Sequence, residues 1–307
     1  MLKTIFKAIV VSAVAAFFCV GCSEKPDDNP VIPTDTTQNP PNNGSGNLVL
    51  GSGEAWTYGN SGFIFTSNNR FFDIYEVGGS WWYADSGSYE TNGNIITINS
   101  VSGTYSISGS TLLLSRYTYT FAKTSDISPK AGEASFTDSR DGKSYKAIKI
   151  NTQIWMAENL NYDVPGVMSD ICYDNKASYC ENYGRLYDWS TAKNAACPVG
   201  FHLPSGAEWD ILVNFAGGES TAGRELKSKI GWNNNGNGTN EYGFSALPGG
   251  GYSGGTFNNA GQYCDWWDAT DSDADHAITR YIHDNGDFVG KYENNKTNLY
   301  SVRCVAD

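Results

Sequence analysis

Along residues 47–124, apolar and polar side chains alternate over short runs, which are separated by turns rich in Gly, Asn and Ser. A period of two places successive side chains on opposite faces of an extended chain, so each run predicts a β-strand. Two similar hairpins follow each other, "SGSYETNGNIITI" at 86–98 and "SGTYSISGSTLLL" at 102–114. About seven short strands without a helical period predict a small all-β domain, either an antiparallel barrel or a sandwich.

The pattern changes after a polar linker at 125–133, and residues 134–307 form a second predicted domain. Within it, the stretch from 184 to 213 contains a Cys, a His, two Trp and three acidic residues, a combination that an active site could use. Its second half has a helical period instead, with apolar residues on one helix face: Trp209, Leu212 and Val213. Ser205 and Glu208 have the spacing of a capping box at the start of that helix. The stretch is therefore predicted to be framework.

The first 46 residues carry a different pattern. Residues 1–21 have a short basic start and an apolar core too short to span a bilayer, and they precede Cys22. This looks like a bacterial lipoprotein signal, in which cleavage before Cys22 is followed by lipidation of its sulfur. Residues 22–46 are rich in Pro, Asn, Asp and Ser, and such a segment predicts a disordered tether. We expect a lipid-anchored protein of the outer membrane, with its folded part exposed at the cell surface.

The charge narrows the range of partners. The formal net charge is −12 and no basic run occurs, which argues against binding to nucleic acid. The membrane is then expected to be reached through the lipid anchor rather than through a basic surface.

Four long motifs in the second domain carry a family resemblance: "DSRDGKSYKAIKINTQIWMAENLNY", "CYDNKASYCENYGRLYDWSTAKNAACPVGFHLPSGAEWDILV", "TAGRELKSKIGWNNNGNGTNEYGFSALPGGGY" and "SVRCV". Together they resemble the Fibrobacter succinogenes major paralogous domain family over most of residues 136–307. That family resembles the C-type lectin fold, which implies an α+β domain with two short helices, a mixed sheet and long irregular loops. No activity carries over from the family. The all-β domain is similar to lipocalin-like modules of bacterial lipoproteins.

Five cysteines follow Cys22, as suits an exported domain. Cys172 and Cys180 flank a short loop and most simply pair with each other. Cys197 and Cys304 match the long terminal disulfide that the lectin-like resemblance implies. Cys264 is left over, and it either is buried or forms an intermolecular bond; we expect burial.

Catalytic and metal motifs are incomplete. "GYSGG" at 251–255 matches a nucleophile elbow around Ser253, but its flanks predict loops rather than the strand and helix that the elbow needs.

"DSDADH" begins like a calcium loop, with Asp at positions 1, 3 and 5: Asp271, Asp273 and Asp275. His276 then replaces the required Gly and Ile282 the required Glu, so an EF-hand is excluded and only a loosely bound calcium ion is left as a prospect. We expect no enzyme activity and no cofactor.

Three residues on loops between the motifs are the predicted binding groups: Tyr252, Trp266 and Asp271. By alternation Trp267 would face the core and Trp266 would face outward, where it could stack on a sugar ring, with Asp271 accepting hydroxyl protons. Residues between the motifs have no evident capping, turn or packing role, so they are free to bind a ligand. The favoured function is a surface-anchored binding or adhesion module for glycans. A structural envelope protein that contacts other proteins is the alternative, and a protein partner would then replace the glycan.

Overall fold

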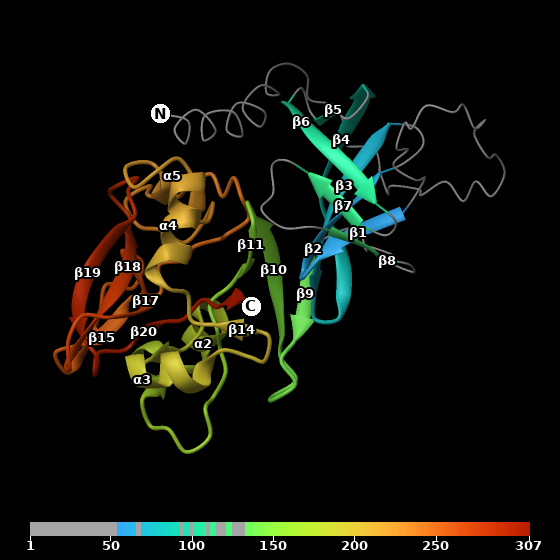
Figure 1. Ribbon diagram of the computed structural model, residues 1–307. Helices are drawn as coiled ribbons and strands as arrows, with labels where there is room; N and C mark the ends of the chain where they lie inside the picture. Colours follow the sequence, from blue (N-terminus) through green and yellow to red (C-terminus); the bar gives the residue numbers. More distant parts are fainter. Residues whose placement is uncertain are drawn as a thin grey trace. The chain divides into compact units, whose positions relative to one another are not determined.

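The computed structural model describes residues 54–65, 69–92, 95–98, 101–108, 111–114, 121–124 and 133–307 (Figure 1). The predicted signal, the predicted lipidation site Cys22 and the predicted tether lie outside these residues. The chain divides into two compact units between Gly132 and Glu133. Neither unit, in its described residues, has a helix that is long and apolar enough to cross a membrane.

The first unit is a closed antiparallel barrel in which each strand pairs with the next and β1 pairs with β8. Its strands are β1(Glu54–Tyr58), β2(Ser61–Phe65), β3(Arg70–Val77), β4(Ser80–Asn92), β5(Ile95–Ile98), β6(Val101–Ser108), β7(Thr111–Leu114) and β8(Phe121–Thr124). One face of the strands fills the interior with large side chains: Trp56, Phe63, Phe65, Phe71, Tyr89, Ile96, Tyr105, Leu112 and Leu114. Of the two all-β arrangements expected from the sequence, the chain adopts the barrel.

The second unit contains two larger sheets and a small hairpin. The five-stranded sheet has the order β14-β21-β11-β10-β9, with β9(Ala134–Thr137), β10(Ser144–Ile150), β11(Gln153–Met156), β14(Phe201–His202) and β21(Val305–Ala306). The six-stranded sheet has the order β12-β13-β20-β17-β18-β19, with β12(Asp170–Ile171), β13(Leu186–Tyr187), β17(Tyr263–Asp271), β18(His276–His283), β19(Gly290–Asn295) and β20(Tyr300–Ser301). The hairpin joins β15(Gly251–Ser253) to β16(Thr256–Asn258).

The helices of this unit are few and short: η1(Tyr173–Asn175), α2(Ala177–Tyr183), α3(Trp189–Thr191), η2(Ala192–Ala196), α4(Gly206–Phe215) and α5(Ala222–Leu226). The predicted capping box is present at the start of α4, where the Ser205 hydroxyl accepts from the backbone N–H of Glu208 and the Glu208 carboxylate accepts from that of Ser205. Trp209, Leu212 and Val213 are buried, as the helical period predicts. The fold is mostly β with few helices.

Two disulfides stabilise this unit, and both join the predicted partners. Cys172–Cys180 closes a short loop before and within α2, whereas Cys197–Cys304 links the end of η2 to the residue before β21. Cys264 is a buried free thiol.

Candidate functional site

The predicted binding residue Trp266 lies in the core, so its expected outward position is wrong. Both Trp266 and Trp267 are 0% exposed. The sheet is covered on both faces at β17: Trp266 packs against Trp209 of α4 at 5.8 Å between ring centroids, and Trp267 against Tyr300 at 5.1 Å. Alternation along a strand separates core from solvent only where one face is open to water, and here neither face is.

Hydrogen bonds fix both indoles in these positions. The Trp266 Nε1–H donates to Oδ1 of Asn159 at 2.9 Å, and the Trp267 Nε1–H donates to the carbonyl of Tyr187 at 2.7 Å. The same Asn159 oxygen accepts from the fully buried guanidinium of Arg303. Trp266 therefore belongs to a buried polar network and cannot stack on a ligand.

Asp271 is exposed, but its carboxylate is already paired. One oxygen lies 2.7 Å from the ammonium of Lys296 and the other 3.5 Å from that of Lys193. No described contact joins Asp271 to Tyr252. The structure therefore does not bring the three predicted binding residues together.

Tyr252, in contrast, belongs to a continuous row of half-buried aromatic rings, which we call the aromatic row. Its ring lies 5.0 Å from that of Phe257 across the β15–β16 hairpin. Phe257 lies 5.1 Å from Tyr173, which lies 5.1 Å from Tyr179, and Tyr179 lies 5.9 Å from Tyr183 on α2. Residues from two distant segments of the sequence thus form one partly exposed apolar strip.

Local covalent structure positions the middle of the aromatic row. Tyr173 and Tyr179 lie just inside the two ends of the loop that Cys172–Cys180 closes. Gly250 lets this loop approach the hairpin: its φ is +65°, and a Cβ there would lie 2.9 Å from Cε2 of Tyr173 and 2.5 Å from the carbonyl oxygen of Asn258. Only glycine accommodates both the backbone angle and the close contact.

The aromatic row ends at a cavity of about 280 Å³ with both polar and apolar walls, and Tyr183 is one of its wall residues. The remaining walls come from β10, α2 and the segments after β11 and before β15: Lys143, Ser144, Tyr145, Glu158, Asn159, Asn161, Cys180, Glu181, Asn182, Gly184 and Leu247. Its volume is close to the lower end of the roughly 300–1,000 Å³ that small-molecule sites span. The cavity is therefore of a size for one small polar ring.

Donors and acceptors are mixed in this cavity. Among the described residues, the side chains of Glu181 and Asn182 have no hydrogen-bond partner, so both can bond a ligand. Burial raises the pKa of Tyr145 far above its usual value, so its phenol stays protonated while it accepts from the backbone N–H of Asn161. The cavity can thus offer a carboxylate, an amide and a hydroxyl to a polar ligand.

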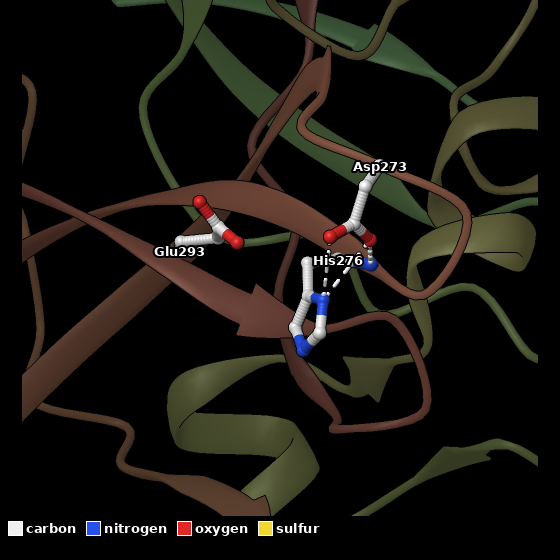
Figure 2. A group of neighbouring side chains, drawn as sticks. All are labelled: Asp273, His276 and Glu293. Carbon is white, nitrogen blue, oxygen red and sulfur yellow. Dashed lines mark hydrogen bonds and ion pairs between the residues drawn. The ribbon is translucent and has the colours of Figure 1, made fainter.

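A second polar group lies at the far end of the β17–β18 hairpin. Asp273, His276 and Glu293 each offer a ligand atom, and these atoms lie within 4.8 Å of one another. Figure 2 shows the His276 imidazole with the two carboxylates on either side. It is the one group of three or more potential metal-ligating His, Cys, Asp or Glu side chains in the described part of the chain. Asp271 is not a member, since its oxygens face lysines.

Among the described residues, the incomplete catalytic motifs are not completed by a catalytic base or nucleophile. Ser253 lies on the short hairpin β15–β16, not on a strand followed by a helix, and its hydroxyl accepts from Nδ2 of Asn258 at 3.0 Å. No described hydrogen bond joins Ser253 to a histidine. His202 is bonded to Glu208 and Asp307 at 2.8 and 2.7 Å, and Cys197 is in a disulfide.

Most of the aromatic row and of the cavity was not predicted from the sequence. The available signal was "CYDNKASYC", in which a Tyr adjoins each half-cystine, but this loop was interpreted only as a disulfide. For His276, the sequence indicates only a departure from the EF-hand pattern.

The comparisons with known proteins identify one domain. The model of the Fibrobacter succinogenes major domain matches residues 148–306. Comparison with curated proteins and with solved structures gave no match. The matched residues cover just over half of the chain and nearly all of the second unit, including the aromatic row, both disulfides and all of the cavity walls except Lys143, Ser144 and Tyr145. The chain therefore belongs to the Fibrobacter succinogenes major domain family.

Proposed function

We propose that this chain is a surface-anchored lipoprotein whose second unit is a non-catalytic, lectin-like head that binds glycans through the aromatic row and the adjoining cavity. The observation that carries the proposal is the continuity of the two: a strip of five half-buried rings leads from Tyr252 to Tyr183, and Tyr183 is a wall of the cavity.

Sugar chemistry fits this combination. The apolar face of a pyranose packs on an aromatic ring, and its hydroxyls bond carboxylates and amides. The cavity has room for one ring, with Glu181 and Asn182 as acceptors and donors, while the row extends well beyond it. We therefore expect an oligosaccharide with one terminal residue in the cavity, rather than a free monosaccharide.

The lectin-like and lipocalin-like parts of the proposal have separate support. In the second unit, β21 near residue 305 pairs with β11 and β14, and Cys197–Cys304 links the same region to a helix. Such a terminal disulfide is what the C-type-lectin-like resemblance implies. In the first unit, eight strands in consecutive order form a closed barrel, which is the arrangement of lipocalins. We assign the barrel the role of a spacer.

The anchoring part rests on Cys22 and the segment around it. Replacing Cys22 by Ala should release the protein from the membrane fraction or block its maturation, since the lipid could no longer be attached. Normal processing and retention of that variant in washed membranes would exclude the lipoprotein assignment.

The binding part is tested on a glycan array with the soluble chain, residues 23–307. We expect saturable binding that Tyr173→Ala abolishes, because Tyr173 is the central ring of the row. Tyr292→Ala is the matched control: this tyrosine is 65% exposed on β19 and has no described ring contact with the row. A folded protein that binds no glycan would favour the alternative, a structural envelope protein that contacts other proteins.

A further inference from the structure

The group formed by Asp273, His276 and Glu293 lies outside the aromatic row and the cavity, and no described residue is shared between them. Strand register explains why its members meet. In the β18–β19 pair, His276 is opposite Asn295 and Ile278 is opposite Glu293. His276 and Ile278 share a face because they are two residues apart, so Glu293 is the diagonal neighbour of His276 on that face.

The turn between β17 and β18 supplies the third member and holds it in place. Oδ1 of Asp273 accepts from the backbone N–H groups of Asp275 and His276, both at 2.8 Å. Nδ1 of His276 lies 3.0 and 3.1 Å from the two carboxylate oxygens of Asp273.

The distances suit a small metal ion between these atoms. Zinc binds imidazole nitrogen and carboxylate oxygen at about 2.0–2.2 Å, so two ligands of a tetrahedral zinc lie roughly 3.3–3.5 Å apart. The observed spacing of 3.0–3.1 Å needs an expansion of only a few tenths of an ångström. The side chain of Glu293 is exposed and its ligand atom lies within 4.8 Å of the other two, so a change of its rotamer would bring an oxygen to the same point.

A nearby lysine does not compete for the site. The ammonium of Lys296 donates to the backbone carbonyls of Asp273 and Ala274, at 2.8 and 3.3 Å, and pairs with the carboxylate of Asp271. Its ammonium therefore bonds the carboxylate of Asp271 and two backbone carbonyls, and not the carboxylate of Asp273. This also gives Asp271 a role different from the predicted contact with a ligand.

We propose that Asp273, His276 and Glu293 form a zinc site that joins the β17–β18 turn to β19. One nitrogen and two carboxylate ligands match zinc, whereas calcium takes six to eight oxygen ligands and does not use imidazole. Three protein ligands leave one tetrahedral position for water or for a donor group of a partner molecule.

The test is calorimetric titration of the soluble, untagged chain with ZnCl2, and in parallel with CaCl2. We expect one zinc per chain, with an affinity that His276→Gln and Glu293→Gln each reduce at least about tenfold. His202→Gln and Glu241→Gln are the controls: they remove an imidazole and an exposed carboxylate elsewhere in the unit, and they should leave the affinity unchanged.

Thermal melting gives a second measurement, since a ligand that binds only the folded state raises the melting temperature. Zinc should raise it for the unmodified chain and not for His276→Gln. The proposal is overturned if the chain takes up no zinc, if either ligand substitution leaves zinc affinity unchanged, or if calcium binds these residues as tightly as zinc.

Discussion

The ring of Tyr173 lies 5.1 Å from the ring of Phe257, and this contact joins the loop closed by Cys172–Cys180 to the β15–β16 hairpin. Neither segment alone forms an extended apolar strip. The contact between Tyr173 and Phe257 creates one, because it connects the ring pair of the hairpin to the tyrosines of α2. The binding proposal thus depends on how firmly the loop is held.

Removing the short disulfide should weaken binding while the domain stays folded. In the chain-entropy model, a loop with a sequence separation of 8 contributes about 2.5 kcal/mol. We expect Cys172→Ser/Cys180→Ser to lower the free energy of unfolding by roughly that amount and to reduce glycan affinity, as measured by denaturant titration and by the array. Unaltered affinity would show that the loop does not form part of the binding surface. Tyr292→Ala again serves as the control.

Truncating Trp266 should destabilise the domain strongly. Its ring is fully buried among Trp209, Phe244 and Arg303, and its indole bonds Asn159. Large-to-small changes of buried aromatic residues cost about 3–5 kcal/mol, so we expect a loss of that size for Trp266→Ala in chemical denaturation.

The matched control for this substitution is again Tyr292→Ala, at an exposed position, where a change within about 0.5 kcal/mol is expected. A Trp266→Ala variant as stable as the unmodified chain would place the indole outside the core.

Stability should depend on pH through His202 and Glu208. The hydrogen bond that His202 donates to the carboxylate of Glu208 raises the pKa of His202 from 6.5 to about 9. Burial acts to raise the pKa of Glu208, but the hydrogen bonds from His202 and Ser205 outweigh it and lower the value from 4.5 to about 2.

The raised histidine pKa contributes stability that is fully present below pH 6.5 and is lost as the pH rises to about 9. The lowered glutamate pKa contributes stability that is present above pH 4.5 and is lost as the pH falls to about 2. We therefore expect the contribution of this pair to be greatest between about pH 4.5 and 6.5. Denaturation of His202→Gln across pH should lack the loss between 6.5 and 9; an unchanged profile would contradict the assignment.

Cys264 should resist alkylation in the folded protein. Burial raises the pKa of its thiol to about 12, and the reactive thiolate is scarce at neutral pH. Iodoacetamide followed by mass spectrometry should label Cys264 only after unfolding. A disulfide-linked dimer through Cys264 would instead support the intermolecular bond that the odd number of cysteines left open.

Sequence patterns correctly predicted the features that depend on residues close together in the chain. The capping box of Ser205 and Glu208 and the apolar face of the following helix occur where the spacing placed them. The short loop between Cys172 and Cys180 likewise favoured their pairing. Each of these depends on residues close in the sequence, so no knowledge of the tertiary fold was needed.

The candidate sites depend on contacts that no local pattern contains. Alternation gave Trp266 the wrong face because it says nothing of a second covering layer, here Tyr187 and Tyr300 on one side and α4 on the other. The EF-hand pattern gives His276 no role as a metal ligand. Its neighbour Glu293 lies on the next strand, where a pattern of nearby residues cannot place it. The partners of such residues are set by strand register and by packing between distant segments.

Strand β21 lies inside the five-stranded sheet, between β14 and β11, and it holds Val305 opposite Trp155. The five-stranded sheet is therefore incomplete until residues 305 and 306 are available to pair with both neighbouring strands. During synthesis, β9, β10 and β11 can pair before β21 exists. The edge of β11 at Trp155 then lacks its partner strand until the last strand is made.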